Sequence, residues 1–166
     1  MASELHVDAI KHSGGTSAMT IDSSGRVTRS LIPSWRIGLT ANVSISATGT
    51  DLEWNNTSTN GRFIQGGCSA SSGVVTVPMA GVYQINTTCR FNDVSNSYVE
   101  LYIKVNNSDD TYGYHVEGDP LSNYHSISAS EIFNLSANDN VRIRLYTGDS
   151  SWTLHQLSNF SGVMIG

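Results

Sequence analysis

The chain has 166 residues, a formal net charge of −5 at pH 7 and charged side chains at only 14% of its positions. This length allows one domain, alone or with an appendage. The negative charge argues against nucleic acid as a partner, because phosphate binding needs clustered Lys and Arg, and no apolar run is long enough to cross a bilayer. The N-terminus, Met-Ala-Ser-Glu-Leu-His-Val-Asp, lacks the basic and apolar regions of a secretory signal, so we expect synthesis in a cytoplasm.

Residues 1–30 predict a small arm of two or three short strands. Apolar residues stand on either side of two turns, His12–Gly15 and Asp22–Gly25, whose glycines supply the positive φ that tight turns need. These apolar residues are too few to make a core, and a lone small hairpin is marginal in water. The arm is therefore either disordered or packed against another surface. The residues expected to anchor it to such a surface are Leu5, Val7, Ile10, Met19, Ile21 and Val27.

A linker near Thr28–Pro33, in which Pro33 favours an extended chain, leads to a larger region. Two polar segments there, Asn55–Asn60 and Gly66–Gly73, predict a turn and a glycine-serine loop. Strands are predicted at Trp35–Leu39, Val43–Ser46, Leu52–Trp54, Phe63–Ile64, Val74–Val77, Val82–Asn92, Tyr98–Asn106, Tyr112–Glu117, His125–Leu135, Val141–Thr147 and within Trp152–Ile165. About ten short strands without helical periodicity indicate an all-β sandwich or barrel.

Several of these segments carry motifs in a fixed order. They are Gly61-Arg62-Phe63, Val77–Ile85, Ile132–Leu135, Asn138–Val141 and Phe160–Ile165. Together they resemble the jelly-roll family that includes the tumour necrosis factors and the globular heads of the first complement component. The resemblance covers residues 34–166 approximately. It implies an all-β jelly-roll sandwich over residues 31–166 that forms a homotrimer, with one sheet of each subunit packed around the three-fold axis.

The implied trimer needs side chains that point away from the core of each monomer. If Phe133 and Leu135 face the core, strand alternation turns Ile132 and Asn134 outward. One exposed Ile is normal in a monomer, so this supports the trimer only weakly. Two tyrosines of the segment from residue 98 also lie on the polar side of their strand. The candidate interface residues are Ile132, Asn134, Tyr98 and Tyr102.

Residues 10–27, Ile-Lys-His-Ser-Gly-Gly-Thr-Ser-Ala-Met-Thr-Ile-Asp-Ser-Ser-Gly-Arg-Val, carry a second resemblance. They are similar to N-terminal segments of structural and fibre proteins of tailed bacterial viruses. This resemblance implies that residues 1–30 form an attachment or trimer-forming arm ahead of a globular head. The predicted division is therefore an arm, residues 1–30, and a head, residues 31–166.

Aromatic residues near strand ends suggest a ligand surface, because aromatic faces stack on sugars. Tyrosine is also favoured in cross-strand pairs and at subunit contacts. Sheet packing, a subunit interface and a carbohydrate-binding surface therefore stay open as alternatives. The candidate ligand-surface residues are Tyr112, Tyr114, Tyr124 and Trp152.

No pattern of catalytic residues occurs in the sequence. The five histidines lack ligand spacing, and there is no Gly-x-Ser-x-Gly motif, so we expect neither an enzyme nor a cofactor. Acidic residues at Asp109-Asp110 and Glu117–Asp119 have the oxygen ligands that calcium prefers, but Asp is ordinary in turns and no metal site is predicted.

The two cysteines do not make a disulfide framework. Cys89 shares an alternating face with Tyr83, Ile85 and Phe91, which predicts a buried, unreactive thiol. A bridge between Cys68 and Cys89 is the alternative.

These features favour a structural component of a tailed-phage virion. The chain would be a trimeric capsid decoration or a short fibre or tail-fibre protein, held by its arm to capsid or tail proteins and displaying its head for surface attachment. A host-surface glycan is a further candidate partner. The alternative function is a soluble recognition module of the complement-head type that binds carbohydrate.

Overall fold

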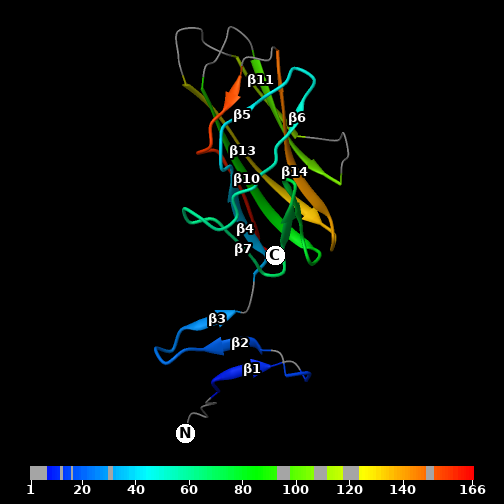
Figure 1. The fold of residues 1–166 in the computed structure, drawn as a ribbon. Coiled ribbons are helices and arrows are strands. Elements are labelled where there is room, and N and C mark those ends of the chain that lie inside the picture. The colour runs from blue at the N-terminus through cyan, green and yellow to red at the C-terminus, as the bar shows by residue number, and fades with distance from the viewer. Residues whose placement is uncertain are drawn as a thin grey trace. The chain divides into compact units, whose positions relative to one another are not determined.

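The computed structural model describes residues 7–11, 13–15, 17–29, 32–92, 98–106, 112–117, 124–148 and 152–166, with the backbone alone at 17–18, 28–29, 112–117 and 124. Over these residues the chain forms strands β1 to β16 and no helix, which confirms the all-β prediction. Accordingly, this part of the chain holds no helix that could span a membrane. The chain divides into two units, Met1–Ile32 and Pro33–Gly166 (Figure 1).

The first unit is a three-stranded antiparallel sheet. Its strands, in the order β1-β2-β3, are Ala9–Lys11, Ser17–Ile21 and Val27–Arg29. Asp22 shapes the turn between β2 and β3, because its carboxylate accepts hydrogen bonds from the backbone nitrogens of Ser24 and Arg26 at 2.9 and 3.0 Å. These bonds, with the Arg26 side chain 2.7 Å away, hold the pKa of Asp22 below its ordinary value.

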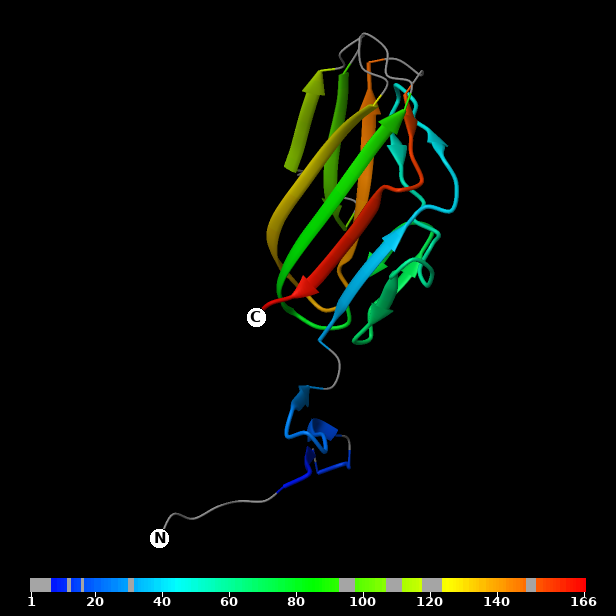
Figure 2. The ribbon, with the colours of Figure 1, turned by 90° about the vertical axis from the view of Figure 1, so that its left-hand side faces the viewer.

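The first sheet of the second unit contains its longest strands. Side by side run β13 (Tyr124–Leu135), β10 (Gly81–Asn92), β16 (Asn159–Met164), β4 (Ser34–Gly38) and β7 (Phe63–Gln65), all antiparallel. The short strands β15 (Thr153–Leu154) and β5 (Val43–Ser44) continue the sheet beyond β16, beside the end of β10. In Figure 2 the long strands lie next to one another across the front of this unit.

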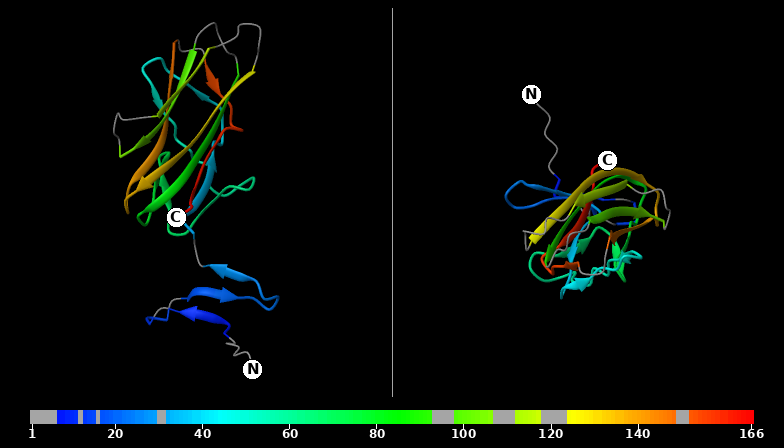
Figure 3. Two further views of the ribbon diagram at one scale, coloured as in Figure 1. Left: turned by 180° about the vertical axis from the view of Figure 1, so that it is seen from behind. Right: turned by 90° about the horizontal axis from the view of Figure 1, so that it is seen from above.

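The second sheet faces the first across the core. Its antiparallel order is β12 (Tyr112–Glu117), β11 (Tyr98–Val105), β14 (Asn140–Thr147), β9 (Val74–Thr76) and β8 (Ser69–Ser71), and β6 (Thr50–Asp51) also pairs with β14. Both sheets curve around the space between them (Figure 3). Together they form the expected jelly-roll sandwich.

Alternation along the strands builds the core between the sheets. On β10 every second side chain from Tyr83 to Phe91 is buried, and on β14 Val141, Ile143 and Leu145 are fully buried, as their period of two predicts. Aromatic rings fill the centre and pack edge to face, with centroids 5.7 and 5.2 Å apart in two pairs. The largest fully buried side chains are those of Trp35, Trp54, Trp152, Tyr83, Phe91 and Phe160.

Two predicted elements differ from the structure by more than a shift of one or two residues at their ends. The strand expected at Leu52–Trp54 lies wholly earlier in the structure, as β6 (Thr50–Asp51). The backbone N–H of Leu52 donates to Ile143 O at 3.0 Å, and beyond this bond the chain leaves the sheet. The loop expected at Gly66–Gly73 contains β8, which pairs with β9 through a two-residue turn at Ser72 and Gly73. Both turn residues have positive φ, 47° and 78°, which is the geometry of a tight hairpin.

Candidate functional site

The outer face of the first sheet carries the predicted interface residue Ile132. The alternation on β13 is as expected, with Leu135 buried, Phe133 half-buried against the core, and Asn134 exposed. Ile132 is 63% exposed and stands opposite Gln84 in the register with β10. An aliphatic side chain this exposed on an ordered strand is unpartnered in the monomer.

A hollow lies on the same outer face, over β4 and β16. It has a volume of about 290 Å³, and Phe63 and Val163 supply apolar side chains to it. Phe63 is 41% exposed. Gln84 on β10 lies opposite Ile132 on one side and opposite Val163 on the other, so Ile132 and the hollow lie on the same face of the sheet.

Part of the remaining outer face carries small polar side chains that bond to one another. Ser130 donates a hydrogen bond to Asn86 Oδ1 at 2.7 Å, and Ser128 donates to Thr88 Oγ1 at 3.1 Å. These pairs link β13 to β10. A partner that covers this face would meet small polar groups whose hydrogen bonds are already partly satisfied.

Tyr98 and Tyr102, the other predicted interface residues, lie on β11 in the second sheet. The hydroxyl of Tyr102 donates to Glu100 at 2.8 Å, and this bond raises the pKa of Tyr102 to about 12. Its ring lies edge-on to Tyr146 with centroids 5.4 Å apart. Tyr98 is 38% exposed. The four predicted residues thus divide between two sheets and do not form one patch within a subunit.

Of the four residues of the predicted ligand surface, the structure describes the side chain of Trp152 alone. Trp152 is fully buried and edge-on to Phe91, so its assignment to a ligand surface is wrong: the residue closes the core beside the end of β10. The side chains of Tyr112, Tyr114 and Tyr124 lie outside the described part, where only their backbone on β12 and β13 is given.

Four of the six predicted anchors of the arm lie on the three-stranded sheet, and Val7 precedes its first strand. Ile10 and Val27 are 52% and 55% exposed, and Ile21 is also exposed. Val7 and Met19 are half-buried, and Leu5 lies outside the described residues. This sheet therefore leaves apolar side chains uncovered within its own unit.

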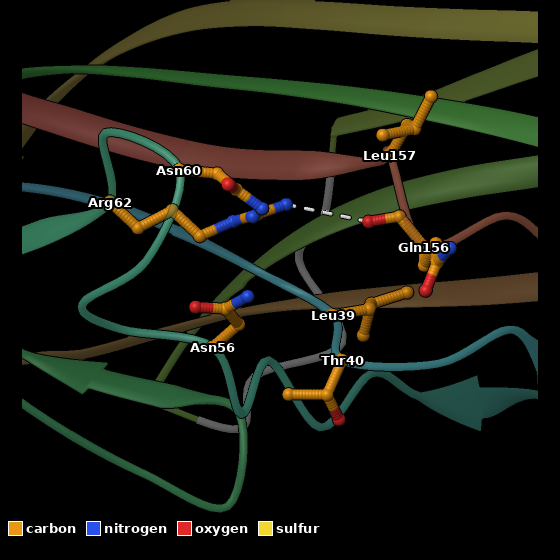
Figure 4. Close-up of a pocket in the computed structure, with 7 residues that line it drawn as sticks. All are labelled: Leu39, Thr40, Asn56, Asn60, Arg62, Gln156 and Leu157. Carbon is orange, nitrogen blue, oxygen red and sulfur yellow. Dashed lines mark hydrogen bonds between the residues drawn. The ribbon is translucent and has the colours of Figure 1, made fainter.

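A polar cavity of about 210 Å³ opens between the end of β4, the 55–62 loop and the turn after β15 (Figure 4). Asn56, one of its lining residues, is held to the end of β4 by Gly38, with which it exchanges two backbone N–H···O bonds of 2.9 Å. The guanidinium of Arg62 occupies the space that a side chain at position 38 would fill, so a larger residue there would displace Arg62. The remaining lining residues are Leu39, Thr40, Asn60, Gln156 and Leu157.

Sequence reasoning missed this cavity because it assigned residues 55–60 to an ordinary polar turn. The available signal is Asn60-Gly61 followed by Arg62: both turn residues have positive φ, 56° and 72°, and the turn reverses the chain so that Arg62 points back over β4. Nothing in the sequence identifies Gly38 as the position it covers.

No group of three or more His, Cys, Asp or Glu that could hold a metal occurs among the described residues. Asp109, Asp110 and Asp119 lie outside them, as does the side chain of Glu117.

Both cysteines are free thiols, so the alternative bridge between Cys68 and Cys89 does not form in this structure. The prediction that Cys89 is a buried thiol is confirmed. Cys89 is fully buried, and this burial raises its pKa to about 12 against the smaller, opposite effect of the Thr87 hydroxyl. Cys68 is half-buried, and burial also raises its pKa.

We expect the folded protein to release one equivalent of chromophore with a thiol-specific disulfide reagent at pH 8. Cys68 should react much faster than Cys89, because thiolate is the nucleophile and Cys89 is fully buried with a pKa raised to about 12. A Cys68→Ser variant leaves only Cys89 and should react solely after denaturation. Rapid reaction of this folded variant would contradict the burial of Cys89.

Comparisons with known proteins give one family match. A family model described as the C1q domain matches residues 35–165, nearly the whole second unit. No curated protein matches the chain.

Proposed function

The chain belongs to the C1q domain family, and we propose that it is a trimeric structural component of a tailed-phage virion, a capsid decoration or short fibre or tail-fibre protein that displays its head for surface attachment. C1q domains are non-enzymatic jelly-roll heads that typically self-associate into trimers and serve recognition or structural roles. One observation carries the proposal: a small β-arm with uncovered apolar residues precedes the head.

The subunit contact follows from the outer face of the first sheet. In a cyclic trimer each contact is heterologous, so two different parts of a subunit's surface must meet. Ile132 protrudes from the edge strand β13, and the hollow at Phe63 and Val163 lies farther across the same face. We assign Ile132 of one subunit to the hollow of the next, which removes apolar area of both from water.

The arm supplies attachment to the particle. Its exposed Ile10, Ile21 and Val27 lie on a sheet of three short strands, which is too small to be stable without further packing. Capsid or tail proteins would cover these residues. The three arms of one trimer would bind more tightly together than one arm alone, because the first contact raises the effective concentration of the other two. A three-fold site on the particle would engage all three arms at once.

We expect deletion of residues 1–32 to abolish incorporation into virions while the head stays folded and trimeric. Incorporation is measured by supplying tagged protein during infection and probing purified particles. The full-length double variant Ile10→Asp/Val27→Asp should show the same loss, because it places charge on the proposed contact.

Lys11→Glu, on the same sheet, changes charge without removing an apolar contact, and its incorporation should be retained. Particles that take up the truncated protein as well as the intact chain would rule out the arm as the attachment element.

The alternative, a soluble recognition module, is favoured by one observation, the polar cavity beside Arg62. That function requires ligand binding by the head and an arm that is dispensable. Wild-type binding by the chain without residues 1–32, together with absence from virions, would favour it over the particle role.

A further inference from the structure

Arg62 is a cation without an anionic partner among the described residues. The only hydrogen bond of its side chain to this part of the chain runs from Nη2 to the backbone oxygen of Gln156 at 3.4 Å, and its buried Nε has no partner. Arg142 and Arg144 also have unpaired Nε atoms, but both reach Asp51, at 3.5 and 3.1 Å. Arg62 has no such carboxylate among the residues that the structure describes.

The position of Arg62 is built into the fold. Gly38 leaves the space in which the guanidinium lies, since any larger residue there would displace it. The Nε side of the guanidinium is buried in this position. Figure 4 shows the outer end of the guanidinium at the cavity, beside Asn60 and across from Asn56. A guanidinium presented in this way can bind a carboxylate through two parallel hydrogen bonds.

The neighbouring amides add donors. Asn56 Oδ1 accepts from the backbone nitrogen and the hydroxyl of Thr59 at 3.3 and 2.8 Å, so its NH2 group is left without a partner in the described part of the chain. The side chain of Asn60 makes no hydrogen bond with any described residue. Donor groups thus surround a local positive charge on a protein whose net charge is −5.

The rest of the cavity suits a ligand larger than a simple anion. Leu157, 60% exposed at the rim, offers an apolar surface for the non-polar face of a sugar ring. The hydroxyl of Thr40 donates to Asn55 at 3.1 Å, so it can still accept a hydrogen bond from a ligand hydroxyl. The volume of about 210 Å³ leaves room beyond a carboxylate.

We propose that this cavity binds a carboxylate-bearing sugar residue of a glycan. The carboxylate lies on the guanidinium of Arg62 and the amide of Asn56, and the ring hydroxyls meet Asn60 and Thr40. This cavity shares no lining residue with the hollow at Phe63 and Val163, so its ligand binding can be tested apart from the trimer and particle assignments.

The test is calorimetric titration of the full-length protein with four probes at low salt. D-Glucuronate carries both the ring and the carboxylate, D-glucose the ring alone, acetate the carboxylate alone, and inorganic phosphate a different anion. We expect glucuronate to bind with a Kd of roughly 1 mM or tighter, at least tenfold tighter than the other three. Raising the salt concentration should weaken it, because the contact is ionic.

Two variants with matched controls locate the binding. Arg62→Gln should weaken glucuronate binding at least tenfold, while Arg26→Gln, which removes the same charge from the arm, should leave it unchanged. Asn60→Gly removes the amide but accepts the positive φ, so the fold is retained and binding should fall at least threefold. Asn138→Gly, at another positive φ of 71°, is its control.

Three results would overturn the proposal. Glucuronate binding no tighter than glucose would exclude a role for the carboxylate. Acetate or phosphate binding as tightly as glucuronate would show a general anion site. Unchanged affinity in folded Asn60→Gly and Arg62→Gln proteins would place the binding elsewhere.

Discussion

Replacing Ile132 with glutamate should convert the proposed trimer to monomers at micromolar concentration. The side chain is 63% exposed in the monomer, so its replacement should cost the monomer fold less than about 1 kcal/mol. In the assembled state the carboxylate would enter an apolar hollow without a counter-ion, which should weaken association on the order of a hundredfold or more. Sedimentation velocity over a concentration series measures the change.

Two comparisons separate assembly from folding. Phe133→Ala, at the next position on β13, removes a ring packed against the core and should destabilise the monomer by roughly 2 to 4 kcal/mol. Ser69→Glu adds the same charge at an exposed position of β8 in the second sheet and should leave the trimer intact. Equal unfolding of Ile132→Glu and Phe133→Ala would show that the outward assignment of Ile132 is wrong.

A double-mutant cycle tests the proposed pairing with the hollow. If Ile132 meets Phe63 across the subunit contact, Ile132→Ala and Phe63→Ala should each weaken association. The double variant should lose less than the sum of the two losses, because both changes remove the same contact. Additive losses would mean that the two residues serve different contacts.

Gly73→Ala should be among the most destabilising single-methyl changes in the head. Gly73 has φ +78°, and a Cβ there would collide with the backbone oxygen of Leu52. The backbone cannot move aside as a flexible side chain would, so the collision adds to the cost of the left-handed conformation. We expect a loss of roughly 3 to 5 kcal/mol in the free energy of unfolding, measured by urea denaturation.

Gly61→Ala is the matched control. Its φ of +72° is nearly the same, but nothing lies within 4 Å of the added Cβ. This variant should therefore lose only the conformational cost of about 1 kcal/mol. Equal losses at both positions would show that the approach of Leu52 to Gly73 does not occur in solution.

The long strands were predictable because each carries its own evidence. The alternation of Tyr83, Ile85 and Phe91 on β10 and of Val141 and Ile143 on β14 identifies strand and buried face together. β12 was predicted with its observed bounds, and the observed β13 begins one residue before its predicted start. Strands of two or three residues, such as β6 and β8, are too short for alternation to distinguish them from turns.

The candidate cavity was beyond the reach of the same reasoning. Asn56, Asn60 and Arg62 are close in the chain, but their function as a site depends on Gly38 beneath the guanidinium and on the turn at Gln156. Trp152 shows the opposite error, because a ligand-binding role was predicted for a residue that is buried in the core. An aromatic residue beside a loop can stack on a ligand or fill the core, and its local sequence is the same in both cases.

Local sequence patterns were sufficient for the all-β class, the outward direction of Ile132 and the burial of Cys89, because side-chain alternation is a property of a single strand. The family resemblance added the jelly-roll form. Three-dimensional packing was required to place Tyr102 and Ile132 on different sheets and to join Arg62 to Gly38. Those relations link segments distant in the chain, and the period of one strand carries no information about which strand becomes its neighbour.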